Sequence, residues 1–471
     1  MVPALNVSTA AGAPGLRQAG LAADSVEAWQ AALPGDTGDY ATDRARYSRF
    51  WQASSALLAR LPAKPQRNGL EGEAAEEIKR VARESRSRFL EVHAEHVYER
   101  LTDRCARFVR VENLVYDASN LVPGLTPTRE QVAAESRSSQ RDKDGIEIDQ
   151  GIFLQHVLAS PRCGRHLCHA MLLPRDEAVA RLPELQRAGR VDLGQASVVR
   201  DGKASYVFLK NPRYLNAEDA GTIDDTEIAV DLAILDPHSE IAVLRGDSVD
   251  HPKYRGRRVL GTGINLTHLY HGKVPYIWYL QRELGFVNKF YRGLARPDVA
   301  PDEVLGDGIE KPWVAVVEAF AIGGHCQYLL AVDYVVAGDD AFLTLPARKE
   351  GIIPGAANLR LPRFTGDRIA RQAIMYQRRI ECDSPEGRLI CDEVVPQGLM
   401  DAAIARIVDN FTNSGVVSAA SNRRAFRVAQ EPLDMFRTYC AVYAREQAYC
   451  HFSPGLIANL ERHWNAQHRK P

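Results

Sequence analysis

The stretch Glu318–Gly355, EAFAIGGHCQYLLAVDYVVAGDDAFLTLPARKEGIIPG, decides the fold of this chain. The apolar run Trp313–Val317 leads into it with the length and β-branched content of a buried strand. Gly323-Gly324 then predicts a turn, after which apolar residues recur at helical spacing. A strand that turns through glycines into a helix leaves backbone N–H groups unpaired, and such donors can hold a developing oxyanion. The alternative is that the glycine pair only lets the helix pack close to the sheet.

The segments on either side of this stretch predict alternating strands and helices from about residue 195 onward. The dipeptide Asp201-Gly202 between two short apolar runs is a strong hairpin signal. Such alternation is expected of βαβ units, and the residues after about 367 are mostly helical in pattern. In chain order, the predicted elements are strands over 196–200 and 204–209, a helix over 224–235 and a strand over 241–244. A strand that ends in a glycine turn follows over 258–266, and then a long helical stretch that carries Arg282.

The residues before this region predict helices only. Apolar residues recur at helical intervals over 43–61 and over about 73–108, and further helical segments run to about residue 186. No glycine-rich phosphate loop is present there, and the opening MVPALNVSTAAGAPG is typical of a flexible leader. We therefore predict an all-helical N-terminal domain over 1–194 and a catalytic domain with a helical C-terminal part over 195–471.

Composition restricts the class of protein. A chain of 471 residues is too long for one compact core, and 45% hydrophobic with 25% charged residues is ordinary for a globular protein. The formal net charge of -1 and the absence of a long apolar run predict no binding to nucleic acid or membrane. The eight cysteines form no CxxC pair, which favours reduced thiols in a cytoplasmic protein. The cluster Cys163, His166, Cys168, His169 matches no zinc spacing, so no metal site is predicted.

The order of the motifs resembles the crotonase (enoyl-CoA hydratase/isomerase) superfamily. The resemblance covers residues from about 195 to the C-terminus. It implies an α/β fold, a spiral of ββα turns, here preceded by the helical domain. It further implies acyl-CoA thioester substrates and a homotrimer or hexamer. The motifs that carry it are the hairpin, NPRYLNA (211–217), LRG (244–246), GTGIN (261–265), AFAIGG (319–324) with its following DY pair, and PARKEGIIPG (346–355).

By this resemblance, the two oxyanion-hole amides are those of Ile264 and Gly324. Hydratases of the family carry two glutamates that handle water, and this chain has Gln327 and Ala347 at those positions. A carboxamide cannot usefully take up a proton near neutral pH, and alanine has no proton chemistry. These departures argue against a hydratase mechanism.

The segments IWYLQRELG (277–285) and AFAIGGHCQ (319–327), together with the helical domain, resemble a cofactor-independent dioxygenase branch of this family. Members of that branch oxidise a dihydroxyphenylacetyl-CoA thioester with O₂ as co-substrate, in antibiotic biosynthesis, and use no metal or organic cofactor. The resemblance implies that Glu218, Arg282 and Gln327 contact the ring hydroxyls. It also implies an apolar oxygen pocket formed by Ile264, Leu266 and Ile352.

Several assignments stay open on sequence alone. The basic segment before the first oxyanion loop could meet CoA phosphates or be a solvated loop; its residues are Lys253, Tyr254, Arg257 and Arg258. His325 is interpreted as steric or structural, and no residue is identified as the general base. Two alternatives to the dioxygenase remain: an acyl-CoA hydrolase or isomerase on the same fold, and a non-catalytic acyl-CoA-binding protein.

Overall fold

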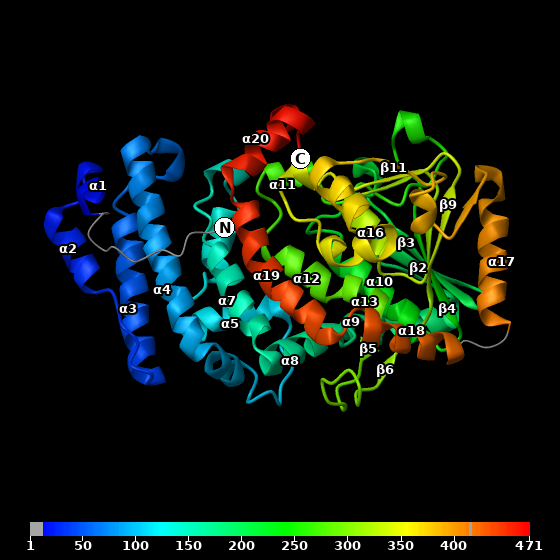
Figure 1. The fold of residues 1–471 in the computed structure, drawn as a ribbon, viewed down its shortest axis with the longest axis horizontal. Helices are drawn as coiled ribbons and strands as arrows, with labels where there is room; N and C mark the ends of the chain where they lie inside the picture. The colour runs from blue at the N-terminus through cyan, green and yellow to red at the C-terminus, as the bar shows by residue number, and fades with distance from the viewer. Residues whose placement is uncertain (1–12, 414–416) are drawn as a thin grey trace.

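The structure is a computed structural model that describes residues 13–413 and 417–471. Helices occupy one end of the molecule, and a twisted sheet with its own helices occupies the other (Figure 1). Most of the predicted leader lies outside the described residues. Its last three residues, from Ala13, begin helix α1 (Ala13–Gln18). Among the described residues, no helix combines the length and the apolar character needed to cross a membrane.

The N-terminal region is helical as far as Ala188. Its longest helix, α4 (Gly69–Leu101), begins with a capping box in which Asn68 and Glu71 exchange side-chain and backbone hydrogen bonds. It ends seven residues before the predicted position, because Asp103, Arg104 and Cys105 adopt positive φ angles that a helix cannot include. The other helices are α2 (Ala23–Ala31), α3 (Tyr40–Leu58), α5 (Val111–Leu121), α6 (Arg129–Glu135), α7 (Ile148–Ala159), α8 (Pro161–Leu172) and α9 (Asp176–Ala188).

A seven-stranded sheet follows, in the order β1-β2-β3-β4-β7-β9-β12. The predicted hairpin is confirmed, with Asp201 paired to Ala204, and the strands from β3 to β12 run parallel. The expectation of helix alone up to residue 194 was wrong at its end, because β1 joins the sheet and the predicted boundary falls between β1 and β2. The strands are β1 (Arg190–Asp192), β2 (Ala196–Asp201), β3 (Ala204–Leu209), β4 (Ile241–Gly246), β7 (Trp313–Val317), β9 (Tyr334–Gly338) and β12 (Glu393–Val395).

A smaller sheet carries the strand that leads into the glycine pair. Its order is β11-β10-β8, with β8 (Phe320–Ile322) parallel to β10 (Phe342–Thr344) and β11 (Ile380–Glu381) at its edge. The strand predicted in 258–266 was wrong, because this segment makes only isolated bridges, among them Gly261 to Ala321 and Ile264 to Glu218. The glycine turn predicted to end it is present. Gly263, at φ 75°, breaks the extended conformation. A hairpin of β5 (Leu294–Ala295) and β6 (Gly308–Ile309) lies apart.

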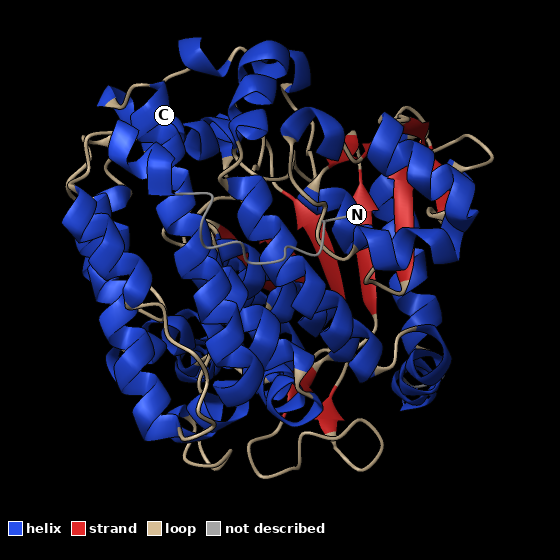
Figure 2. Cartoon of the chain, turned by 60° about the vertical axis from the view of Figure 1, so that its left-hand side comes forward, coloured by secondary structure: helices blue, strands red, loops and turns tan. Residues whose placement is uncertain are grey.

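Helices cover both faces of the sheet (Figure 2). Those between the strands are α10 (Ile223–Leu235), α11 (Leu266–Tyr270), α12 (Ile277–Leu284), α13 (Phe286–Arg292), α14 (Gly324–Leu329) and α15 (Ala347–Glu350). The C-terminal helices are α16 (Ala357–Tyr376), α17 (Met400–Thr412), α18 (Val417–Gln430), α19 (Leu433–His451) and α20 (Pro454–Trp464).

One hydrophobic core joins the N-terminal helices to the sheet and to the C-terminal helices. Helix α19 lies against α7 across the middle of the molecule (Figure 1). Buried hydrogen bonds cross the same junction: the Tyr276 hydroxyl donates to the Ala444 carbonyl at 2.6 Å, and the Tyr276 N–H donates to the Glu147 carboxylate at 2.7 Å. Tyr276, the residue before α12, is therefore held both by the N-terminal helical region and by α19.

Candidate active site

Two glycine loops meet at the edge of the small sheet. Gly323 follows β8 with φ 56° and is the residue before α14, and Gly263 lies opposite. A Cβ placed on Gly263 would lie 2.8 Å from the Gly324 nitrogen, so the two backbones touch. The Ile322 N–H donates to the Gly261 carbonyl at 3.1 Å and fixes the loops to each other. Ile264 and Gly324 line one narrow cavity of about 30 Å³, which has room for one or two water-sized molecules.

The backbone amides of Ile264 and Gly324 are available as donors. Neither N–H has a hydrogen-bond acceptor within residues 13–413 and 417–471. The amides on each side of Ile264 are occupied: Gly263 donates to His325 and Asn265 donates to the Glu218 carbonyl. The arrangement leaves one free donor on each loop at the wall of the same cavity, as an oxyanion hole requires.

The predicted ring-binding residues lie together at this cavity. Arg282, on α12, donates through Nε to the Glu218 carboxylate at 2.7 Å and through Nη1 to the Gln327 side-chain oxygen at 2.7 Å. It also donates to Glu283 and, at 2.8 Å, to the Gly324 carbonyl. The Arg282 side chain is 3% exposed, so its guanidinium is a buried cation held in place by its four partners.

The charge of Glu218 is stabilised by its neighbours. Burial would raise the pKa of this carboxyl, but the Arg282 guanidinium, together with hydrogen bonds from Arg282 and the Tyr328 hydroxyl, holds its pKa below the usual value. Its Oε2 is buried and accepts no hydrogen bond from the described residues. A Cβ on Gly324 would lie 2.0 Å from this oxygen, which is why position 324 has to be glycine.

Glu350 is a functional candidate that sequence reasoning missed. It ends α15, is 7% exposed and lines the narrow cavity. Burial raises its pKa to about 7. The one available signal was its place in the PARKEGIIPG motif, three residues after Ala347, the position where hydratases of the family carry a glutamate.

His325 holds the loop that carries Ile264. Its Nδ1 accepts the Gly263 N–H at 2.9 Å, which places the ring hydrogen on Nε2. Burial lowers the pKa of His325 to about 4, so the ring is neutral at ordinary pH. This hydrogen bond to Gly263 is the contact through which His325 could play the structural role predicted for it.

The three residues of the predicted oxygen pocket are divided between two cavities. Ile264 and Ile352 line the narrow cavity with Ala347. Leu266 lines a wider cleft of about 650 Å³, which Ile264, Pro346 and Glu350 also border. The two spaces therefore adjoin at these three shared residues.

Basic side chains surround the wider cleft, and they differ from the predicted CoA-binding set. The cleft is lined by Arg213, Lys349, His463, Arg469 and Lys470. In contrast, Arg257 pairs with Asp340 at 2.7 Å and Arg258 pairs with Asp247 at 2.8 Å. The predicted residues Lys253, Tyr254, Arg257 and Arg258 line neither cavity, so their contact with CoA stays a prediction.

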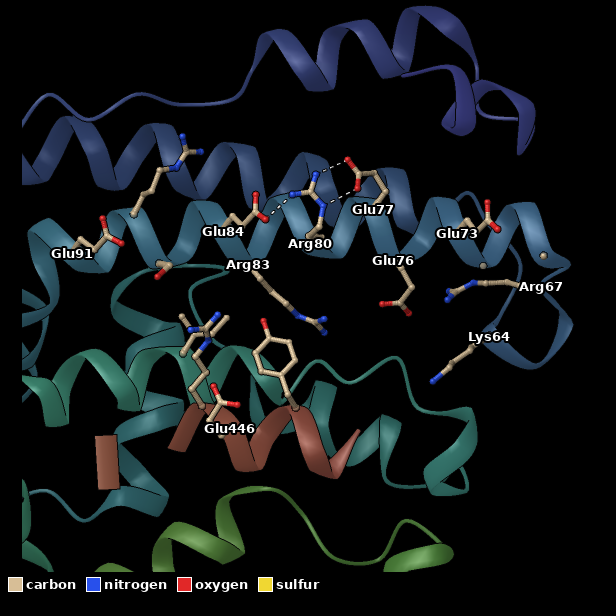
Figure 3. Close-up of a pocket in the computed structure, with 17 residues that line it drawn as sticks. Lys64, Arg67, Glu73, Glu76, Glu77, Arg80, Arg83, Glu84, Glu91 and Glu446 are labelled. Carbon is tan, nitrogen blue, oxygen red and sulfur yellow. Dashed lines mark hydrogen bonds and ion pairs between the residues drawn. The ribbon is translucent and has the colours of Figure 1, made fainter. Parts of the chain in front are cut away.

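Two other features carry no comparable chemistry. A groove of about 1160 Å³ beside α4 is lined by charged residues that neutralise each other; Figure 3 shows Arg80 held between Glu77 and Glu84. In the Cys163–His169 segment, His166 contacts the Tyr98 hydroxyl at 2.7 Å and His169 contacts the Arg296 carbonyl at 3.0 Å. The described part of the chain holds no group of three or more His, Cys, Asp or Glu side chains placed to bind a metal.

The sequence that forms this site is similar to those of known proteins. A profile described as enoyl-CoA hydratase/isomerase matches residues 305–438. The (3,5-dihydroxyphenyl)acetyl-CoA 1,2-dioxygenase of Amycolatopsis orientalis is 45% identical over 419 residues, which cover 89% of this chain and 95% of that protein. This chain belongs to the enoyl-CoA hydratase/isomerase, or crotonase, superfamily.

Other known proteins match shorter parts of the chain. Carnitinyl-CoA dehydratase of Citrobacter koseri is 31% identical over 144 residues, 28% of this chain and 55% of that protein. Among solved structures, an enoyl-CoA hydratase from Mycobacterium avium subsp. paratuberculosis has a TM-score of 0.46 and 19% identity, covering 57% of this chain and 98% of its own. An enoyl-CoA hydratase/isomerase from Xanthobacter autotrophicus has a TM-score of 0.47 and 20% identity, covering 59% and 96%.

Proposed function

We propose that this chain oxidises (3,5-dihydroxyphenyl)acetyl-CoA with O₂ to 3,5-dihydroxyphenylglyoxylate and free CoA, without metal or organic cofactor. The observation that carries this proposal is the 45% identity to a dioxygenase of that name over nearly the whole chain. The gathering of Glu218, Arg282 and Gln327 beside two free backbone donors supports it.

The polar cluster suits a ring with two hydroxyl groups. Arg282 offers charged donors, while Glu218 offers a buried oxygen that lacks a donor among the described residues. Because the cavity has a volume of only about 30 Å³, the ring has to widen it on entry. In this scheme, ring hydroxyls replace the hydrogen bond between Arg282 and Gln327.

The thioester and the CoA arm are assigned to the junction and to the wider cleft. The thioester oxygen accepts from the Ile264 and Gly324 amides, each of which contributes on the order of 3–4 kcal/mol to an enolate-like transition state. The CoA phosphates lie toward the basic residues of the cleft, since Lys349 and Arg469 are exposed there.

The substrate itself can supply the electrons that reduce O₂. The ring and the thioester both acidify the α-carbon, and its enolate can reduce O₂ by one electron before recombination to a peroxide. Attack of that peroxide on the thioester carbonyl expels CoA. Overall, the α-carbon loses four electrons, and its two hydrogens leave as protons. O₂ accepts the four electrons, and its two atoms become the ketone oxygen and one carboxylate oxygen of the product.

The setting proposed for this reaction is a cytoplasmic homotrimer or hexamer that serves dihydroxyphenylglycine formation in antibiotic biosynthesis. Its eight cysteines are all free thiols in the structure, which agrees with a reducing compartment. The oligomer and the pathway follow from the family resemblance.

Oxygen uptake tests the proposed function. Purified protein with (3,5-dihydroxyphenyl)acetyl-CoA and a strong chelator should consume O₂ and release thiol and keto acid in equal amounts. Thiol release that is unaffected by removing O₂ would favour the hydrolase alternative. Tight substrate binding with no turnover would favour the non-catalytic one, and activity restored by iron after chelation would contradict cofactor independence.

A further inference from the structure

Glu350 lies where the two cavities adjoin. It borders the narrow cavity with Arg282 and Gly324, and it borders the wider cleft with Lys349 and His463. Among the described residues, Ile264 and Pro346 are the only others that line both cavities. A Cβ on Gly323 would lie 3.9 Å from Glu350 Oε1, so the carboxyl is next to the residue that precedes the Gly324 donor.

We propose that Glu350 is the catalytic base that removes the α-proton of the thioester substrate, an inference that rests on the proposed function. The α-carbon is bonded to the ring on one side and to the thioester carbon on the other. If the ring lies in the narrow cavity and the CoA arm in the cleft, the α-carbon lies at their junction. Glu350 is the titratable side chain that lines both spaces.

The other carboxyl groups at the cavity are already engaged. Glu218 accepts from Arg282 and Tyr328, and Glu283 accepts from Arg282 and from the Ala356 N–H at 3.2 Å. The Glu350 carboxylate, in contrast, has no hydrogen-bond or ion-pair partner among the described residues, and burial alone shifts its pKa. A buried, unpaired carboxylate is a stronger base than one that a guanidinium stabilises.

The remaining groups near the junction are poorer bases. His325 uses Nδ1 to accept the Gly263 N–H, and Gln327 cannot take up a proton. Tyr279 on α12 and Tyr443 on α19 also line the narrow cavity, and burial raises the pKa of both. On the cleft side, Lys349 and His463 are exposed. Glu177, a surface carboxylate on α9 with 60% side-chain exposure, lines neither cavity and serves as the matched control.

Glu350 alone can carry out all the proton transfers that the reaction needs. The Glu350 carboxylate takes the first α-proton, and the electron pair of the C–H bond moves into the enolate held by the Ile264 and Gly324 amides. After the peroxide displaces CoA, Glu350 returns that proton to the CoA thiolate. The regenerated carboxylate takes the second α-proton as the O–O bond breaks to give the ketone and the carboxylate.

Exchange of the α-protons in D₂O without O₂ tests this role apart from the oxidation. We expect wild-type protein to exchange them and Glu350→Gln to slow exchange at least 100-fold, since a general base contributes about 10²–10⁴-fold. Glu350→Asp should retain part of the exchange rate, and Glu177→Gln should exchange within threefold of wild type. Substrate affinity and the thermal midpoint should stay unchanged or rise in Glu350→Gln.

Exchange by Glu350→Gln within threefold of wild type would overturn the assignment, as would a loss in Glu177→Gln equal to that in Glu350→Gln. Aerobic oxygen uptake by wild-type protein is measured alongside. Wild-type protein that binds the thioester but neither exchanges nor consumes O₂ would overturn the proposed function, and this inference with it. Normal wild-type oxidation with an unaffected Glu350→Gln exchange would overturn this inference alone.

Discussion

The Glu218 carboxylate and the Arg282 guanidinium form a buried ion pair with a 2.7 Å hydrogen bond, next to the backbone of Gly324. The guanidinium also holds Glu283 and Gln327, so one cation organises three side chains. Its burial would lower its pKa, yet the surrounding carboxylates hold that pKa well above the usual value. Arg282 is therefore a structural centre of the site as well as a candidate substrate contact.

Removing this cation should destabilise the fold. Arg282→Met leaves Glu218 and Glu283 buried without their partner, which costs about 3–5 kcal/mol for a pair of this kind. Urea unfolding measures the loss. The control is Arg181→Met, whose partner Glu184 lies 2.7 Å away at the surface with 43% side-chain exposure, and which should cost less than about 1 kcal/mol. Equal losses in the two variants would contradict the buried pair.

A single methyl group at position 324 should abolish turnover. In Gly324→Ala the new Cβ would lie 2.0 Å from Glu218 Oε2, so the carboxylate or the loop has to move away from the free amide. Gly72→Ala is the matched control, because that helical glycine has no atom within 4 Å of its Cβ position and the change should add about 1 kcal/mol of stability. Turnover by Gly324→Ala within a few-fold of wild type would contradict the proposed oxyanion hole.

The glycine pair and its strand could be predicted because local signals suffice there. Trp313–Val317 is apolar at every position and forms β7, and Gly323-Gly324 leads into α14 as the spacing indicates. The segment 258–266 has the same apolar look, yet it makes only single bridges, because its glycines turn the chain and Asn265 caps α11. Apolar content alone could not separate a strand from a loop that packs between two strands.

The electrostatics of the site could not be predicted from local sequence. Glu283 and Glu350 look alike in the chain, but one is bound to Arg282 and the other has no partner among the described residues. Arg257 and Arg258 looked free to bind phosphate, whereas residues distant in sequence, Asp340 and Asp247, neutralise them. Partners of this kind are set by tertiary contacts that no spacing rule shows.

The stability of the protein should report the ionisation of Glu350. Its pKa is near the ordinary 4.5 when unfolded and about 7 in the fold, so between these values the folded state binds more protons. Its contribution to the free energy of unfolding is present below about pH 4.5 and is lost as pH rises through about 7. The stability of Glu350→Gln relative to wild type should therefore increase from pH 5 to pH 8, by on the order of 3 kcal/mol. A difference that is constant over this range would contradict the burial of an unpaired carboxyl.

The hydrogen bond between Gly263 and His325 should matter for rate more than for affinity. His325→Phe leaves the buried Gly263 N–H without its acceptor, at a cost of about 1–3 kcal/mol, and frees the loop that carries the Ile264 amide. We expect kcat to fall about tenfold or more with little change in KM. His169→Phe, in the helical region, is the control and should keep normal kcat. Equal kcat values for the two variants would show that His325 only fills space.

The origin of the product's oxygen atoms tests the central claim most directly. Under ¹⁸O₂, with quenching before the ketone exchanges with water, the account predicts that the keto acid gains both labelled atoms, one in the ketone and one in the carboxylate. The same reaction in H₂¹⁸O under ordinary O₂ should leave the carboxylate unlabelled. A carboxylate oxygen that comes from water, or CoA released with an unoxidised arylacetate, would contradict the account.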